Sequence, residues 1–164
     1  MTAISGSLRK IDDAPHLVLT RRFAAPAADV WLDLTDSDRL ERWIGRWEGD
    51  PASGSIVFFM TAEGEDVPGE AYTILDCDPP RRFAGDTASG WRLWFELAES
   101  GGETTLTFGQ RLSPTDDIGS IGPGWEYYLD RLVAAQAGVD PGSIEWDHYY
   151  PVLQGEYERL VAAD

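Results

Sequence analysis

The sequence predicts an α+β protein in which one antiparallel sheet is covered by a long helix. The first observation is an alternation of apolar and polar residues in strand-like segments between residues 46 and 111. It is clearest in one segment, where four apolar side chains share a face: Trp91, Leu93, Phe95 and Leu97. The second observation is an apolar stripe at helical spacing after residue 124. A sheet with one apolar face has to bury that face, and this helix is the only predicted element large enough to cover it.

A hairpin and two short helices are predicted before the sheet-rich region. The segments "SLRKI" and "HLVLTRRF" form the hairpin strands, and "DDAP" is the turn between them. The first helix lies in "APAADVWLDLT", with Pro26 in its first turn. The second covers residues 37–43, with Asp36 or Ser37 as its cap, and Gly45 ends it.

Five strands are predicted next, separated by Gly, Pro and Asp. They are "SIVFFMTA", "GEAYTILDCD", "RRFAGD", "GWRLWFELAE" and "ETTLTFGQRL". The last two are joined by a hairpin turn in "ESGGE".

The chain returns to helix after residue 111. Three glycines and Pro123 predict an irregular entry over residues 118–124, followed by an amphipathic helix from Trp125 to Gly138. A last helix is predicted in "EWDHYYPVLQGEYERLVAAD", with four apolar side chains on one side: Leu153, Tyr157, Leu160 and Val161.

The gap between sheet and helix is where we expect a function. A strongly twisted sheet that curls around one helix leaves space between them, and the chain has 7 Trp, 6 Tyr and 6 Phe residues to line it. The alternative is that these side chains pack against one another as an ordinary core. The predicted cavity-lining, ligand-binding residues are Trp43, Phe58, Met60, Tyr72, Ile74, Trp91, Leu93, Phe95, Trp125, Tyr128 and Leu129.

Composition and charge exclude several classes of partner. The chain has 164 residues, which favours one domain over residues 1–164, and its net charge of −16 argues against nucleic acid and an anionic membrane surface. We find no apolar run long enough for a signal peptide or a membrane span, so we expect a cytoplasmic protein. A homodimer remains open.

No constellation of catalytic or metal-binding residues stands out, and no cofactor motif is present. In "EWDHYY", His148 lies near two carboxylates, but without a second histidine a surface role is favoured over a metal site. The single cysteine, Cys77, cannot form an intramolecular disulfide and is expected to be buried as a small apolar residue. Arg81 and Arg82 are expected to pair with carboxylates rather than to clamp an anion.

Four segments together resemble bacterial relatives of the C-terminal domain of the heat-shock-90 chaperone ATPase activator. They are "LVLTRRFAAPAADVWLDLTDSDRLERWIG", "DCDPPRRFAGD", "ETTLTFGQRL" and "GWEYYLDRL". These AHSA-type relatives belong to the START-like (SRPBCC) superfamily, which includes lipid-transfer proteins, pollen allergens and aromatase/cyclases. The resemblance implies a helix-grip fold: a curved antiparallel sheet of six or seven strands around a long C-terminal helix, with a cavity between them. It does not imply one activity.

Three functions follow as hypotheses. The leading one is a protein without catalytic activity that binds a small, largely apolar ligand. The second is an enzyme of the cyclase, dehydratase or hydrolase type acting on an apolar or polyketide-like substrate, and its candidate charged groups are Arg21, Glu96 and Glu126. The third is a module that binds a chaperone, as the relatives' name implies; no exposed apolar patch in the sequence supports it.

Overall fold

The sheet contains eight strands in a single antiparallel arrangement. The structure is a computed structural model, and it describes residues 4–64 and 66–162. The strands are β1 (Ser7–Ile11), β2 (Ala14–Phe23), β3 (Arg46–Glu48), β4 (Ser55–Phe59), β5 (Glu70–Asp78), β6 (Arg82–Thr87), β7 (Arg92–Ser100) and β8 (Glu103–Arg111). Their spatial order is β1-β2-β8-β7-β6-β5-β4-β3. The short β3 adds to the strands that the sequence predicts.

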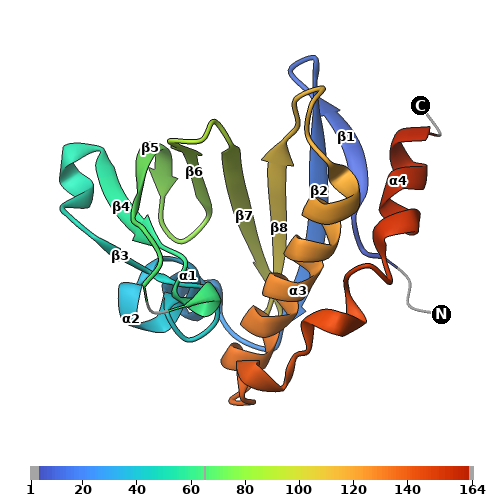
Figure 1. The fold of residues 1–164 in the computed structure, drawn as a ribbon. Coiled ribbons are helices and arrows are strands. Elements are labelled where there is room, and N and C mark those ends of the chain that lie inside the picture. The colour runs from blue at the N-terminus through green and yellow to red at the C-terminus, as the bar shows by residue number, and fades with distance from the viewer. Residues whose placement is uncertain (1–3, 65, 163–164) are drawn as a thin grey trace.

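The helices lie on one side of the curved sheet and at its edges. They are α1 (Ala27–Thr35), α2 (Ser37–Leu40), α3 (Ile118–Gln136) and α4 (Gln154–Ala162). Figure 1 shows α3 crossing the sheet over β8 and β2, with α4 on its far side next to β1. The predicted α+β fold, with a curved antiparallel sheet and a long C-terminal helix, is therefore confirmed. No described helix is long and apolar enough to cross a membrane.

The two short helices differ slightly from the prediction. Pro26 is the N-cap of α1 rather than part of its first turn. Asp36 caps α2, and its side chain accepts a hydrogen bond from the backbone N–H of Arg39. The α-helical part ends at Leu40, and the predicted remainder to residue 43 forms turns.

The long helix begins seven residues earlier than the sequence predicts. Asp117 caps it by accepting from the backbone N–H of Gly119, and helix continues through Pro123. Two of the glycines that suggested an irregular entry are explained by a neighbouring helix: a Cβ at Gly122 would overlap the ring of Tyr157 in α4, and one at Gly119 would crowd the Glu158 side chain. The glycines therefore allow two helices to approach closely.

The last helix is shorter than predicted. It begins at Gln154, and a single 3₁₀ turn, η4 (Trp146–His148), is the only helical stretch that the structure describes between Glu145 and Leu153. Pro151 lacks a backbone N–H and disfavours helical geometry at the residue before it, which explains the late start. Leu153 and Tyr157 are buried as predicted, whereas Val161 is exposed.

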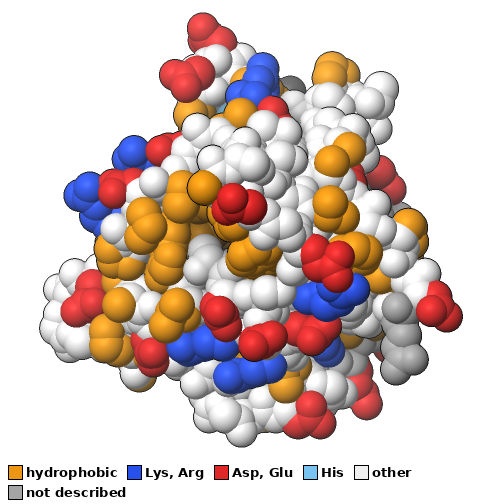
Figure 2. All heavy atoms as spheres, turned by 90° about the vertical axis from the view of Figure 1, so that its left-hand side faces the viewer, with side chains coloured by type: hydrophobic (Ala, Val, Ile, Leu, Met, Phe, Trp, Pro, Cys, Tyr) orange, Lys and Arg blue, Asp and Glu red, His pale blue; other side chains and the backbone are white. Residues whose placement is uncertain are grey.

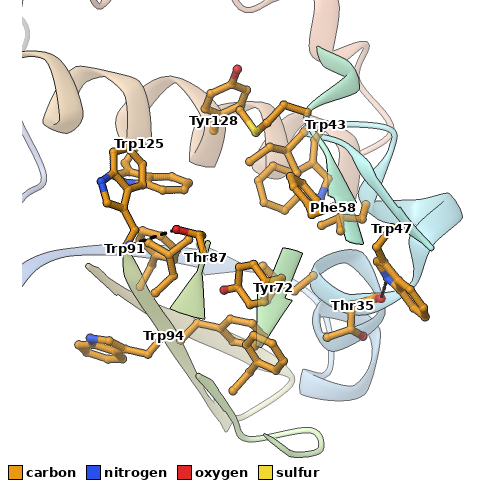
Figure 3. A pocket seen from close by; sticks show the side chains of 18 of the residues that line it. Thr35, Trp43, Trp47, Phe58, Tyr72, Thr87, Trp91, Trp94, Trp125 and Tyr128 are labelled. Carbon is orange, nitrogen blue, oxygen red and sulfur yellow. Dashed lines mark hydrogen bonds between the residues drawn. The ribbon is translucent and has the colours of Figure 1, made fainter. Parts of the chain in front are cut away.

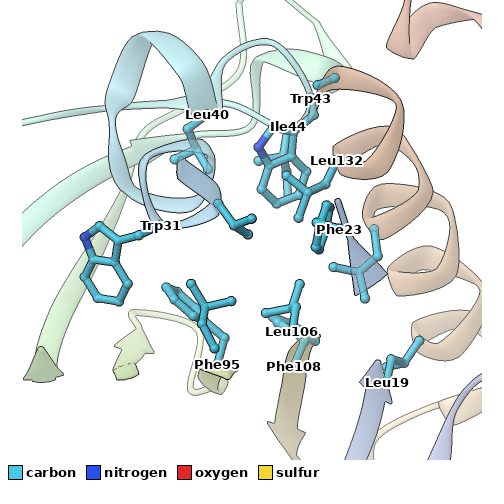
Figure 4. Close-up of a cluster of buried hydrophobic side chains, with 14 of the residues drawn as sticks. Leu19, Phe23, Trp31, Leu40, Trp43, Ile44, Phe95, Leu106, Phe108 and Leu132 are labelled. Atoms are coloured by element: carbon cyan, nitrogen blue, oxygen red, sulfur yellow. The ribbon is translucent and has the colours of Figure 1, made fainter. Parts of the chain in front are cut away.

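The apolar core fills the part of the interior between α3, α1 and strands β2, β7 and β8. Figure 4 shows side chains of these elements converging, among them Phe23, Trp31, Phe95, Leu106 and Leu132. Each is at most 8% exposed. This packed region anchors α3 at one end of the sheet, and the interior beyond it is not filled.

Candidate ligand-binding site

A large cavity lies between the sheet and α3. Its volume is about 1020 Å³, at the upper end of what small-molecule sites enclose. Strands β4 to β8, helices α1 and α3, and the segment that connects α2 to β3 contribute to its wall. Figure 2 shows hydrophobic side chains gathered around a hollow on one face of the molecule.

Ten of the eleven residues that the sequence predicts as ligand-binding line this cavity. They are Trp43, Phe58, Met60, Tyr72, Ile74, Trp91, Leu93, Phe95, Trp125 and Tyr128. Figure 3 shows Tyr72 and Trp91 on the sheet side and Trp125 and Tyr128 on the α3 side. The eleventh, Leu129, is not in the wall; it is 1% exposed and belongs to the core.

Several lining residues were missed at the sequence level. Tyr127, Gly124 and Ser120 lie on the cavity side of α3, and Trp146 comes from the irregular segment that follows this helix. The ring of Trp146 stacks on Tyr150 and meets Tyr127 edge to face, with centroids 5.7 and 5.3 Å apart. Irregular segments have no periodicity that would assign their side chains to a face, so only the tertiary structure places Trp146.

Several polar groups of the large lining side chains already have protein partners. Trp43 Nε1 donates to the Asp33 carbonyl (2.7 Å) and Trp47 Nε1 to the Thr35 carbonyl (2.8 Å). On the opposite side, Trp125 Nε1 donates to Gln110 Oε1 (2.6 Å). These bonds fix the orientation of the rings, so that the wall presents mainly their apolar faces.

The described wall contains one charged side chain, Glu63. It is exposed, and its Oε1 accepts a hydrogen bond from the Tyr128 hydroxyl at 3.0 Å. Burial, together with the Glu63 charge, raises the pKa of Tyr128 above its ordinary value. The Tyr128 hydroxyl therefore stays protonated near neutral pH and serves to hold Glu63.

The three charged residues considered for catalysis lie elsewhere. Glu96 is exposed and outside the cavity wall. Arg21 and Glu126 meet at 2.7 Å on the α4 side of α3, where Glu126 also accepts from Ser5 and Tyr157. Neither belongs to the cavity wall.

The remaining sequence candidates also lie away from a reactive site. His148 is exposed and lies 3.3 Å from Glu145. Arg81 and Arg82 pair with Asp78 and Asp76, as predicted. No group of three or more His, Cys, Asp or Glu side chains within residues 4–64 and 66–162 is arranged to hold a metal ion.

The expectation that Cys77 is buried was wrong. Its side chain is exposed at the edge of the cavity. A register shift in β5 between Ile74 and Asp76 brings Cys77 opposite Phe83, one residue before the end of the strand. Partial burial and the charges of Asp76 and Asp78 raise the pKa of the thiol, which suppresses the reactive thiolate.

Comparison with known proteins identifies the family. The profile of the family described as "Activator of Hsp90 ATPase homolog 1-like protein" matches residues 24–137, which include α1, all but two strands of the sheet and α3. The chain belongs to this family. The AHSA-type, START-like identity inferred from sequence is thereby confirmed, and folds of this family are of a ligand-binding type. A comparison with curated proteins gave no match.

Solved structures of similar proteins have the same fold, in two of the following three cases over nearly the whole chain. The crystal structure of CalU16 from Micromonospora echinospora is 27% identical, with a TM-score of 0.75 and 95% of each chain covered. EF2215 from Enterococcus faecalis, a conserved protein of unknown function, is 20% identical, with a TM-score of 0.74, 97% of this chain and 92% of that chain covered. DynU16, described as a putative protein in the dynemicin biosynthetic locus, is 17% identical, with a TM-score of 0.58, 77% of this chain and 49% of that chain covered.

Proposed function

We propose that this protein binds one small, largely apolar molecule in the cavity between the sheet and α3, without transforming it. The observation that carries the proposal is the cavity of about 1020 Å³ with an aromatic wall. A flat apolar ligand would replace water against these rings, and burial of apolar surface is the main favourable term in such binding. The orientations of Trp43, Trp47 and Trp125 are set by hydrogen bonds to the protein, so little ordering accompanies binding.

The chemistry of the wall favours binding over catalysis. General acid–base catalysis requires a titratable side chain within hydrogen-bond reach of the bound molecule. The charged side chain in the described wall, Glu63, is exposed and already hydrogen-bonded to Tyr128. The similarity of this chain to DynU16, which is described as a putative protein in a biosynthetic locus, supports a small-molecule ligand rather than a macromolecular one.

Gly124 offers a way to fill the cavity without disturbing the protein. It lies in α3 in the cavity wall, and a Cβ built on it would meet no atom within 4 Å. A Gly124→Phe variant should place its ring in the cavity, whereas Gly124→Ala adds one methyl group and serves as the matched control.

The test is a titration with neutral polycyclic probes, beginning with fluorene, followed by tryptophan fluorescence and native mass spectrometry. We expect one probe per chain in the wild type and in Gly124→Ala, and affinity lower by about tenfold or more in Gly124→Phe because the ring competes for the same space. Circular dichroism checks that each variant is folded. Absence of binding to the wild type, or equal affinity in folded Gly124→Phe, would show the proposal to be wrong.

A further inference from the structure

We propose that Tyr72 is the polar contact for the ligand. The ligand carries a neutral oxygen, such as that of a keto group, which accepts a hydrogen bond from the Tyr72 hydroxyl. This inference rests on the proposed function and adds a chemical requirement to it. It would make the ligand an apolar molecule with one hydrogen-bonding position at a defined place in the cavity.

The Tyr72 hydroxyl is one of the polar groups of the wall that form no hydrogen bond with a described residue. The side chain comes from β5 and lines the cavity. Figure 3 shows its oxygen directed into the space between the sheet and α3, toward the side where Trp91 lies. Trp43, Trp47, Trp125 and Tyr128, by contrast, all donate to protein acceptors. The hydroxyl opens onto the cavity rather than being enclosed by protein, so a ligand oxygen that takes the place of water there would accept its hydrogen bond.

The protein holds the ring of Tyr72 in a fixed place. Gly85 of β6 lies beneath it, and a Cβ at that position would overlap Tyr72 Cε1. Phe83, two residues away on the same face, stacks on the ring with centroids 6.1 Å apart and an interplanar angle of 25°. Glycine in the middle of a strand is intrinsically unfavourable, so its presence here is explained by the close approach of this ring.

The surroundings of Tyr72 determine which ligand group fits. Burial, together with the nearby Asp86 carboxylate, raises the pKa of Tyr72 above its ordinary value, so the hydroxyl remains a neutral donor. The charge of Glu63 in the described wall disfavours an anionic ligand, and the net charge of −16 acts in the same direction. A neutral carbonyl oxygen is the acceptor that meets these conditions.

Two probes of the same shape isolate this contact. 9-Fluorenone and fluorene differ by the keto oxygen, and Tyr72→Phe removes only the hydroxyl. We expect Tyr72→Phe to weaken fluorenone binding by about fivefold, as for loss of one neutral hydrogen bond, and to leave fluorene affinity unchanged within twofold. The infrared carbonyl stretch of bound fluorenone should lie at lower frequency in the wild type than in Tyr72→Phe.

Trp91 provides the matched comparison, because its Nε1 also has no hydrogen-bond partner among the described residues and it lines the same cavity. Trp91→Phe reduces the apolar wall and should weaken both probes alike. If Tyr72→Phe weakens the binding of both probes equally, or if Trp91→Phe is the variant that selectively weakens fluorenone binding, Tyr72 is not the polar contact for the ligand. Binding of fluorene to the wild type would still support the proposed function in either case. If neither probe binds the wild type, both proposals are wrong.

Discussion

The two sides of α3 differ in how closely neighbouring side chains pack against them. On the side facing α4, polar groups are paired and glycines are covered: Glu126 accepts from Ser5, Arg21 and Tyr157, and Gly122 lies against the Tyr157 ring. On the side facing the curved sheet, Gly124 has no atom near its potential Cβ. One helix therefore carries a closed structural face and an open face.

This difference places contributions to stability on one side of α3 and the proposed ligand-binding surface on the other. The closed face ties the N-terminal strand region and α4 to the helix through long-range contacts, so changes there should lower the free energy of unfolding. The open face contributes less to stability because its side chains border empty space. Functional sites are expected where packing is left incomplete. Substitutions on the two faces should therefore differ in their effects on the free energy of unfolding and on ligand binding.

The largest effect is expected from Arg21→Ala. Arg21 is 12% exposed and bonds both Glu126 (2.7 Å) and Asp130 (3.0 Å). Its removal leaves a carboxylate buried without its cation, and we expect the free energy of unfolding in urea to fall by about 3 kcal/mol. The control is Arg22→Ala on the same strand, because Arg22 is 78% exposed and its contact with Glu103 is 3.8 Å long; its effect should stay within about 0.5 kcal/mol. Equal effects of the two variants would contradict the closed-face interpretation.

The same cluster predicts a dependence of stability on acid pH. Burial alone would raise the pKa of Glu126, but hydrogen bonds from Ser5, Arg21 and Tyr157 outweigh it, and the pKa is lowered overall. A carboxyl whose pKa is depressed in the folded state stabilises the fold above its unfolded-state pKa, and that contribution is lost as pH falls through the folded-state pKa.

Urea unfolding between neutral pH and pH 3 measures this contribution. Wild-type stability should decline as pH falls below the ordinary glutamate pKa, and Glu126→Gln should be less stable at neutral pH but show a shallower decline. Glu103→Gln, an exposed carboxyl on β8, should leave the pH profile unchanged. Parallel profiles of wild type and Glu126→Gln would show that Glu126 does not contribute in this way.

A smaller loss is expected from Gly122→Ala. The new methyl group would overlap the Tyr157 ring, which is completely buried and cannot turn away freely. Overpacking of this kind should reduce the free energy of unfolding by about 2 kcal/mol, measured by thermal or urea unfolding. Unchanged or increased stability would mean that α4 can shift away from α3, and that the closed face is less tightly packed than the structure indicates.

The glycines also show what the sequence could and could not predict about the fold. Alternation and helical periodicity predict the order of the strands and the helices, because these patterns are local. The start of α3 was placed at Trp125 because three glycines and Pro123 suggest an irregular segment. The partner that accounts for Gly122 is Tyr157, 35 positions further along the chain. Contacts over such a distance leave no local pattern.

The wall of the cavity was predictable to the extent that it lies on regular elements. Trp91, which immediately precedes β7, and Leu93 on β7 follow the period of a strand. Trp125 and Tyr128 on α3 follow the period of a helix, so the shared side of these residues could be inferred. The same periodicity placed Leu129 with them, although it faces the core, because one residue along a helix turns the side chain by about 100°. Trp146 has no such period to follow. The volume of the cavity depends on the tertiary structure, and no sequence pattern distinguishes a filled core from a cavity.

The smallest effect, and the one with the opposite sign, is expected from Gly124→Ala. Glycine within a helix is less favourable than alanine by about 1 kcal/mol, and the added methyl group enters open space, so stability should rise by up to this amount. Thermal unfolding measures the change, and fluorene binding should remain close to that of the wild type because one methyl group occupies little of the cavity.

Gly122→Ala is the natural comparison, since the same change two residues away in the same helix should be destabilising. If both alanines destabilise the protein, the space beside Gly124 is filled in solution, and the cavity side of α3 is a packed face like the other. If only Gly122→Ala does, the glycine at 124 is not required by any protein contact, and the space next to it is available to a ligand.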